Sequence, residues 1–227
     1  MNSSRPKTGL SVLKIILGFV FGFLVLMLSS VLIVLSGVSD LMHMGMFAFS
    51  FVLILVLSKG KISEYGFKVS GDLKLKNTVL VGLIAGFIIT SSTLVLPIHP
   101  PPGVEDFSFF ELVIFIWILA SVGEEVLTRG LIQSYLSPLR GFGFSILGFP
   151  ISLPVLAGAL FFGGMHLGLL SMGLDSFSVW AIVISAFFMG IIAGYYREKT
   201  ESIIPAIIIH ILFNICGTII GAIKELI

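Results

Sequence analysis

The chain has 227 residues, of which 57% are hydrophobic and only 11% are charged, and its formal net charge is +1. Soluble domains carry about 25% charged residues, so a water-soluble fold of this composition would leave large apolar patches facing water. The composition therefore indicates an integral membrane protein. The near-zero net charge argues against a nucleic-acid partner, and the single cysteine, Cys216, excludes a disulfide within the chain.

Stretches of roughly 20 mainly apolar residues predict membrane-spanning helices. In chain order they are 13–36, 41–58, 78–97, 107–136, 150–170, 178–196 and 202–222. Pro150 and Pro154 interrupt the start of the fifth stretch, which predicts a bent or re-entrant entry. The predicted fold class is an all-α, polytopic bundle of about seven transmembrane helices. It forms one integral membrane domain over 1–227, with N-terminal spans at 13–97 and a motif-bearing core at 107–222.

Lysine and arginine occur on alternate connections, and this bias predicts the orientation because short cytoplasmic loops are enriched in them. The basic connections contain Arg5, Lys7, Lys14, Lys59, Lys61, Lys68, Lys74, Lys76, Arg140, Arg197 and Lys199, whereas those near Asp40, Glu105, Asp106 and Asp175 contain none. With an odd number of spans, the N-terminus is cytoplasmic and the C-terminus lies outside, and we expect the protein in the cell membrane. The polar stretch 59–77 is predicted to be an amphipathic segment on the cytoplasmic lipid surface.

Three charged residues occur together inside the fourth apolar stretch, in the sequence SVGEEVLTRG. Each costs roughly 2.5–3.5 kcal/mol at the centre of a membrane helix. Glu125 and Arg129 are four residues apart on one helical face, so Arg129 is predicted to hold Glu125 ionised. Glu124 points about 100° away and is free to face a cavity. The alternative is an inert ion pair that only fixes helix packing, although buried ion pairs stabilise weakly.

Two later stretches contain histidines with a helical partner. The sequence ALFFGGMHLG places Phe162 and His166 on one face, and IPAIIIHILFN places His210 one turn before Asn214. At about 1.5 Å of rise per residue, Glu124, His166 and His210 reach similar depths in the cytoplasmic half of the membrane. The sequence therefore predicts that a carboxylate and two imidazoles meet in one cavity.

The other histidines, His43 and His99, fall in or near the outer connections. They are predicted to be ordinary interfacial residues. A serine nucleophile is not indicated, because no serine lies one helical turn from His166 or His210. Phosphate-binding and dinucleotide-binding fingerprints are also missing from the sequence.

Two hydrolytic mechanisms fit this constellation. In the first, His166, His210 and Glu124 bind zinc and leave a fourth position open for water. In the second, which needs no metal, Glu124 takes a proton from water while His210 and Asn214 donate hydrogen bonds to the developing oxyanion. Both predict hydrolysis of an acyl bond, and the residues alone do not choose between them.

These motifs resemble those of the type II CAAX prenyl endopeptidases and their prokaryotic relatives, the CPBP or Abi intramembrane proteases. The resemblance covers 111–218 and rests on E-E-x-x-x-R at Glu124, Glu125 and Arg129, on F-x-x-x-H at Phe162 and His166, and on H-x-x-x-N at His210 and Asn214. It implies that Glu124 is the base, His166 its catalytic partner, His210 with Asn214 the oxyanion site, and Glu125, Arg129 and Phe162 supporting residues. Thr128 departs from the family, where an aromatic residue is common, and we expect this to affect substrate fit.

The resemblance implies an intramembrane endopeptidase whose substrate is a prenylated CAAX-type peptide or another hydrophobic peptide, reached from the cytoplasmic side through membrane lipid. Eukaryotic relatives remove the last three residues of prenylated proteins, and many prokaryotic relatives are linked to bacteriocin maturation or self-immunity. One alternative is a non-catalytic immunity or scaffold protein that binds a partner. Another is a transporter that relays protons or ions, for which inverted repeats are expected and none is seen.

Overall fold

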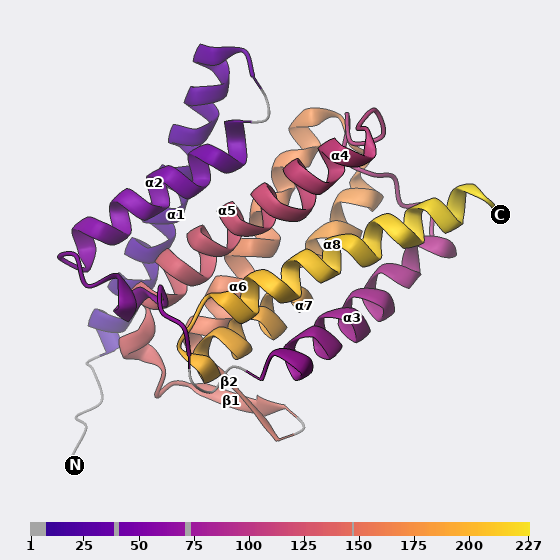
Figure 1. The fold of residues 1–227 in the computed structure, drawn as a ribbon. Coiled ribbons are helices and arrows are strands. Elements are labelled where there is room, and N and C mark those ends of the chain that lie inside the picture. The colour runs from indigo at the N-terminus through magenta and orange to yellow at the C-terminus, as the bar shows by residue number, and fades with distance from the viewer. Residues whose placement is uncertain (1–7, 39–40, 71–73, 147) are drawn as a thin grey trace.

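The computed structural model describes residues 8–38, 41–70, 74–146 and 148–227, and most of them are helical (Figure 1). The longer helices are α1 (Thr8–Ser36), α2 (Leu41–Leu57), α3 (Leu75–Thr90), α6 (Leu153–Met165), α7 (Ser176–Thr200) and α8 (Ile204–Glu225). One further helix runs without a break through α4 (Phe109–Glu111), a π-helical segment (Leu112–Ala120), α5 (Ser121–Glu125) and a second π-helical segment (Val126–Gln133). We call this run, 109–133, the central helix.

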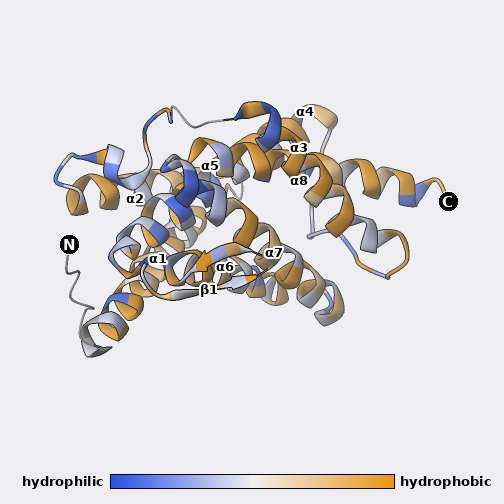
Figure 2. Ribbon diagram, turned by 90° about the horizontal axis from the view of Figure 1, so that it is seen from below, coloured by the Kyte–Doolittle hydropathy of each residue, from blue (hydrophilic) through white to orange (hydrophobic). Residues whose placement is uncertain are grey.

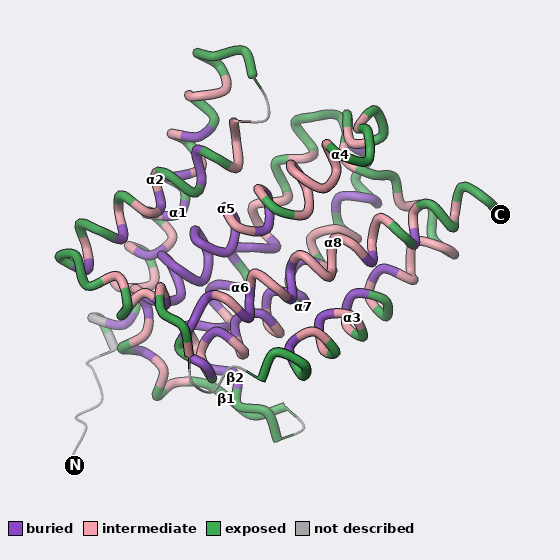
Figure 3. The backbone as a smooth tube through the Cα atoms, in the orientation of Figure 1, coloured by how far each residue is buried: buried purple, intermediate pink, exposed green. Residues whose placement is uncertain are grey.

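The central helix contributes most to the buried interior. Every residue from Val126 to Gln133 is buried. Its second half packs against α1, α2 and α6, while α5 contacts α2 and α8. Figure 1 shows it crossing between the α1–α2 pair and α8, and the buried trace in Figure 3 follows the same path. Residues on this helix are therefore positioned by neighbours from both halves of the chain.

The outer surfaces of the surrounding helices are apolar. Large hydrophobic side chains such as Phe23, Ile88 and Phe188 are more than half exposed, and Figure 2 shows hydrophobic residues along the outer helices. Among the described residues, five helices are long and apolar enough to cross a membrane. Since such surfaces are stable only against lipid, the chain is an integral membrane protein.

Five of the seven predicted spans are thus matched by helices of full spanning length: Ser11–Ser36, Leu75–Leu94, Leu153–Met172, Ser176–Thr200 and Ile204–Glu225. The second predicted span corresponds to α2, which has only 17 residues. The fourth corresponds to the central helix, which contains Glu124, Glu125 and Arg129 and changes between α and π geometry. The bundle is confirmed as nearly all helical, and a count of seven stays a prediction.

The fifth predicted span is present, but its helix begins at Leu153 and not at residue 150. Strands β1 (Gly143–Ile146) and β2 (Phe149–Ser152) form an antiparallel hairpin, with Gly143 opposite Ser152, and α6 begins only at Leu153. Ser152 caps α6 by accepting a hydrogen bond from the Val155 backbone N–H. A short apolar run does not by itself distinguish a strand from a buried helix, so the sequence pattern could not resolve this hairpin.

The stretch 59–77 was predicted to be an amphipathic segment on the cytoplasmic lipid surface. Its described part contains a four-residue 3₁₀ turn, Ile62–Tyr65, and the start of α3 at Leu75, and residues 71–73 lie outside the described residues. The stretch docks on the end of the bundle, because Gly66 O accepts from Ile203 N at 3.0 Å and Lys68 O accepts from Ser202 Oγ at 2.6 Å. These hydrogen bonds hold it against the start of α8, and its position relative to the lipid stays a prediction.

Candidate active site

Glu125 and Arg129 form the ion pair that their four-residue spacing predicts. Arg129 NH1 lies 2.9 Å from Glu125 Oε1, and both side chains are completely buried. The second oxygen of Glu125, Oε2, has no hydrogen-bond partner among the described residues. Removing either partner would leave an uncompensated charge in a dry interior. The intact pair is therefore needed for this part of the helix to stay buried.

Arg129 joins this pair to two other helices. Its NH2 group donates to the Gly190 carbonyl of α7 at 3.0 Å, and NH1 also donates to Thr128 Oγ1 at 2.6 Å. The guanidinium lies over the Phe162 ring of α6, 4.8 Å from its centroid. Phe162 therefore contacts the buried cation through its ring face, and its supporting role in the reaction stays a prediction.

Glu124 lies between two imidazoles. His210 Nε2 on α8 is 3.7 Å from Glu124 Oε2, and His43 Nε2 on α2 is 3.4 Å from Glu124 Oε1. The Glu124 side chain keeps 10% of its surface accessible, whereas that of Glu125 keeps none. The two adjacent carboxylates thus have different surroundings, as their positions on the helix predict.

The prediction that His43 is an ordinary interfacial residue was wrong. It enters the site from α2, which contacts α5 directly. The sequence offers only a weak signal for it, a histidine two residues before Gly45 in an otherwise apolar stretch. Helical periodicity gives no information about which distant helix lies opposite Glu124, so sequence reasoning missed this residue. His99, by contrast, stays in an outer connection and is exposed.

The ring orientations of His166 and His210 follow from their Nδ1 contacts. His166 Nδ1 lies 2.8 Å from the Phe162 carbonyl oxygen, and because a carbonyl only accepts, Nδ1 carries the proton there. His210 Nδ1 lies 3.0 Å from Glu125 Oε1. An ionised carboxylate also only accepts, so this Nδ1 carries a proton as well. Both imidazoles also meet the edge of the Phe162 ring, at centroid distances of 5.1 and 5.4 Å. Each Nε2 is left for a substrate, a water molecule or Glu124.

Asn214 is held against the central helix. Its Nδ2 donates to the Ile116 carbonyl and to Ser121 Oγ, both at 3.1 Å. The structure brings Asn214 to the same side of α8 as His210, one turn away, but it shows no contact between Asn214 and Glu124. An oxyanion role for Asn214 therefore requires one of its N–H groups to leave its present acceptor.

A three-ligand zinc site does not fit these side chains. Over the described ranges, no group of three His, Cys, Asp or Glu residues is arranged to hold a metal ion. His210 Nε2 lies 3.7 Å from Glu124 Oε2, but His166, the third predicted ligand, contacts Phe162 through both its Nδ1 and its ring. We derive no catalytic step through a metal.

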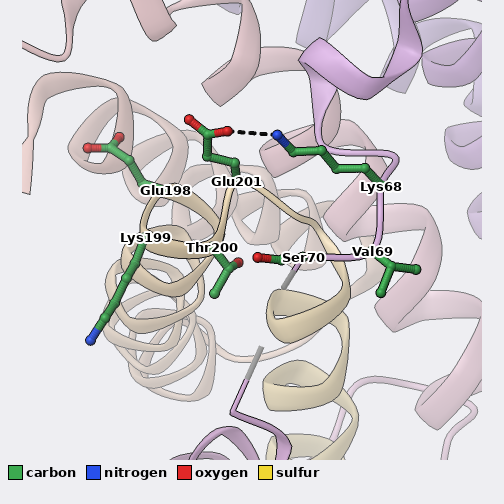
Figure 4. Close-up of a pocket in the computed structure, with 7 residues that line it drawn as sticks. All are labelled: Lys68, Val69, Ser70, Glu198, Lys199, Thr200 and Glu201. Carbon is green, nitrogen blue, oxygen red and sulfur yellow. Dashed lines mark hydrogen bonds and ion pairs between the residues drawn. The ribbon is translucent and has the colours of Figure 1, made fainter. Parts of the chain in front are cut away.

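A separate polar pocket of about 400 Å³ lies where the basic connections meet at one end of the bundle (Figure 4). Its walls are formed by Lys68, Val69, Ser70, Glu198, Lys199, Thr200 and Glu201. Lys68 Nζ donates to Glu201 Oε2 at 2.7 Å, and this hydrogen bond holds the pKa of Glu201 below its ordinary value. None of the candidate catalytic side chains lines this pocket, so we do not assign the reaction to it.

Comparisons with known proteins place the motif region in a family. No curated protein and no solved structure matches the chain. Residues 106–216 match the model of a protein family described as type II CAAX prenyl endopeptidase, Rce1-like. This match includes Glu124, Glu125, Arg129, His166 and His210, the residues brought together above. Over residues 106–216, just under half of the chain, the protein is therefore similar to the Rce1-like type II CAAX prenyl endopeptidase family.

Proposed function

We propose that the chain is an intramembrane endopeptidase in which Glu124 activates a water molecule for attack on a peptide carbonyl. The observation that carries the proposal is the difference between the two adjacent carboxylates. Glu125 is fully buried and bound by Arg129 and His210, whereas Glu124 keeps some accessible surface and its ion-pair partners are the imidazoles of His43 and His210. Glu124 is thus the carboxylate available to take a proton, and the family match points to the same reaction class.

The histidines supply hydrogen bonds to the reacting atoms in this proposal. When His210 carries both protons, its Nδ1–H donates to Glu125 and its Nε2–H is directed toward Glu124, beside the attacking water. A donor there stabilises the oxyanion that forms when water adds to the carbonyl. His166, whose Nδ1–H is held by the Phe162 carbonyl, offers Nε2 as the second polar contact, and Asn214 contributes if one of its N–H groups is released.

In this proposal Glu124 both accepts the proton of the attacking water and returns it to the product. Glu124 accepts a proton from the attacking water, the C–N bond of the tetrahedral intermediate breaks, and the proton on Glu124 passes to the leaving amine. Glu125 and Arg129 take no part in bond making. Their role is to fix the helix turn that presents Glu124, since a misplacement of about 1 Å can cost on the order of 100-fold in rate.

The proposed substrate is a prenylated CAAX-type peptide, or another hydrophobic peptide, at the cytoplasmic side. Two observations support it: the family match, and the apolar outer surface that lets a lipid-anchored substrate approach through the membrane. The basic connections that gather at one end of the bundle favour that end as the cytoplasmic one, through the bias of lysine and arginine toward cytoplasmic loops.

The test is cleavage of a fluorogenic farnesylated CAAX peptide by purified protein in lipid vesicles. We expect Glu124→Gln and His210→Ala to lower kcat by roughly 100- to 10,000-fold, the range of general acid–base catalysis, while a zinc chelator leaves the wild-type rate unchanged. The matched control is Glu111→Gln, which makes the same change near the start of the central helix, where the Glu111 carboxylate accepts hydrogen bonds from Ser108 N and Oγ. Equal rates for wild type and Glu124→Gln would sink the proposal.

A further inference from the structure

His43 lies on α2, outside the family-matched region 106–216, yet its imidazole reaches the proposed base. His43 Nε2 is 3.4 Å from Glu124 Oε1, and 25% of the His43 side chain is accessible. The two oxygens of Glu124 face different halves of the chain: Oε1 faces His43 on α2, and Oε2 faces His210 on α8. The carboxylate is therefore flanked from two sides, and only one of these sides belongs to the recognised family region.

The backbone brings α2 to this place independently of the imidazole. A Cβ atom at Gly123, the residue before Glu124, would lie 2.5 Å from the His43 carbonyl oxygen, so only glycine allows this approach. On its other side α2 is fixed against α1, where a Cβ at Gly45 would lie 3.2 Å from the Ser29 Cα. Two close helix crossings thus set the position of His43 relative to Glu124.

A glutamate that acts as a base must present one oxygen to water at hydrogen-bond distance, although its side chain has several rotatable bonds. The charged and titratable groups around Glu124 come from four places: His43 from α2, His210 from α8, Glu125 and Arg129 from its own helix, and, at longer range, His166 from the 3₁₀ helix that follows α6. Of these, only His43 lies beside Oε1 within ion-pair distance. Without it, nothing among the described side chains restrains that oxygen.

We infer that His43 is a positioning residue for Glu124, which fixes the carboxylate through an Nε2–H contact to Oε1 and makes α2 a necessary part of the site. This inference rests on the proposed role of Glu124 as the base. The N-terminal half of the chain then does more than support the fold, because it supplies one of the groups that orient the reacting carboxylate.

The test compares two amide variants that differ in reach. His43→Gln keeps an N–H donor near the position of Nε2, whereas His43→Asn is shorter and withdraws it. With the farnesylated CAAX peptide we expect His43→Asn to lower kcat on the order of 100-fold with little change in KM, and His43→Gln to stay within several-fold of wild type. His99→Leu, which removes an exposed imidazole elsewhere, is the control and should leave both constants unchanged.

The inference is overturned if the Gln and Asn variants have equal kcat values, or if the loss in His43→Asn appears only as lower thermal stability. Glu124→Gln measured alongside separates the two proposals: if it abolishes cleavage while both His43 variants are fully active, the protease stands and the positioning role fails.

A spectroscopic readout does not depend on activity. The ¹⁵N resonance of His43 Nε2 should shift in Glu124→Gln and stay unchanged in Glu111→Gln; no shift in Glu124→Gln contradicts the contact even if no peptide is cleaved.

Discussion

Glu124 and Glu125 are neighbours in sequence and have different surroundings in the structure. Glu125 is surrounded by a guanidinium, an imidazole and the interior of the bundle, while Glu124 meets imidazoles from two other helices. The roughly 100° turn between adjacent helical positions produces this division. A single pair of identical side chains therefore supplies both a structural anchor and a candidate base.

Arg129→Ala should lower folded yield as well as activity. The substitution leaves Glu125 buried without its cation, which typically costs about 3–5 kcal/mol. The measurement is the monodisperse yield after detergent extraction and the thermal unfolding midpoint. Arg140→Ala is the control, because that arginine is one-third exposed and its pairs with Glu198 and Glu201 are long, at 3.6 and 3.9 Å. If Arg129→Ala folds as well as wild type, Glu125 loses its supporting role.

At the scale of elements, the site depends on how closely α2 approaches the central helix. Gly123 and Gly130 are both on this helix, and they differ in what a methyl group would meet. At Gly123 the obstacle is the His43 backbone oxygen, whereas at Gly130 it is the end of the Ile54 side chain, at 3.3 Å. Side chains can rotate and a packed helix backbone cannot, so only Gly123 fixes the distance between the two helices.

Gly123→Ala should therefore push α2 away from the central helix and lower both stability and activity. Overpacking of this kind costs about 1–3 kcal/mol. Gly130→Ala should be close to neutral, because the small side-chain adjustment is offset by the better helix propensity of alanine. Thermal unfolding and peptide cleavage of the two variants provide the comparison. Equal behaviour of both would show that the approach of α2 does not matter to the site.

For the whole molecule, the connections rich in lysine and arginine gather at one end of the bundle. Lys68 pairs with Glu201, Arg140 approaches Glu198, and Ser134 binds the Tyr65 carbonyl, so three connections far apart in sequence meet there. At the opposite end Lys224 donates to the Leu96 and Ile98 carbonyls. The alternation of spans predicted from charge is compatible with this arrangement.

Cysteine accessibility in intact cells tests the orientation. Lys61→Cys should react with a membrane-impermeant maleimide only after the cells are opened, whereas Glu105→Cys should react in intact cells. The native Cys216 is buried and should not interfere. Labelling of Lys61→Cys in intact cells would reverse the predicted orientation, and with it the assignment of the cytoplasmic side.

Sequence reasoning succeeded where the signal is local. The Glu125–Arg129 pair and the contact of Phe162 with His166 both follow from a spacing of four residues on one helix. It failed where the signal is a contact between distant segments. The His43–Glu124 contact and the 143–152 hairpin depend on which segments pack together, and hydrophobic periodicity does not encode that choice.

The contacts around Glu124 also determine when the site can exist during synthesis. His43 enters the membrane early, with the second helix, and His210 enters with the last one. Until α8 has been inserted, Glu125 lacks its imidazole partner and Glu124 is flanked from one side only. If Glu124 is the base, as proposed, we expect a chain truncated before α8 not to cleave the peptide, because the imidazole of His210 is missing from the site.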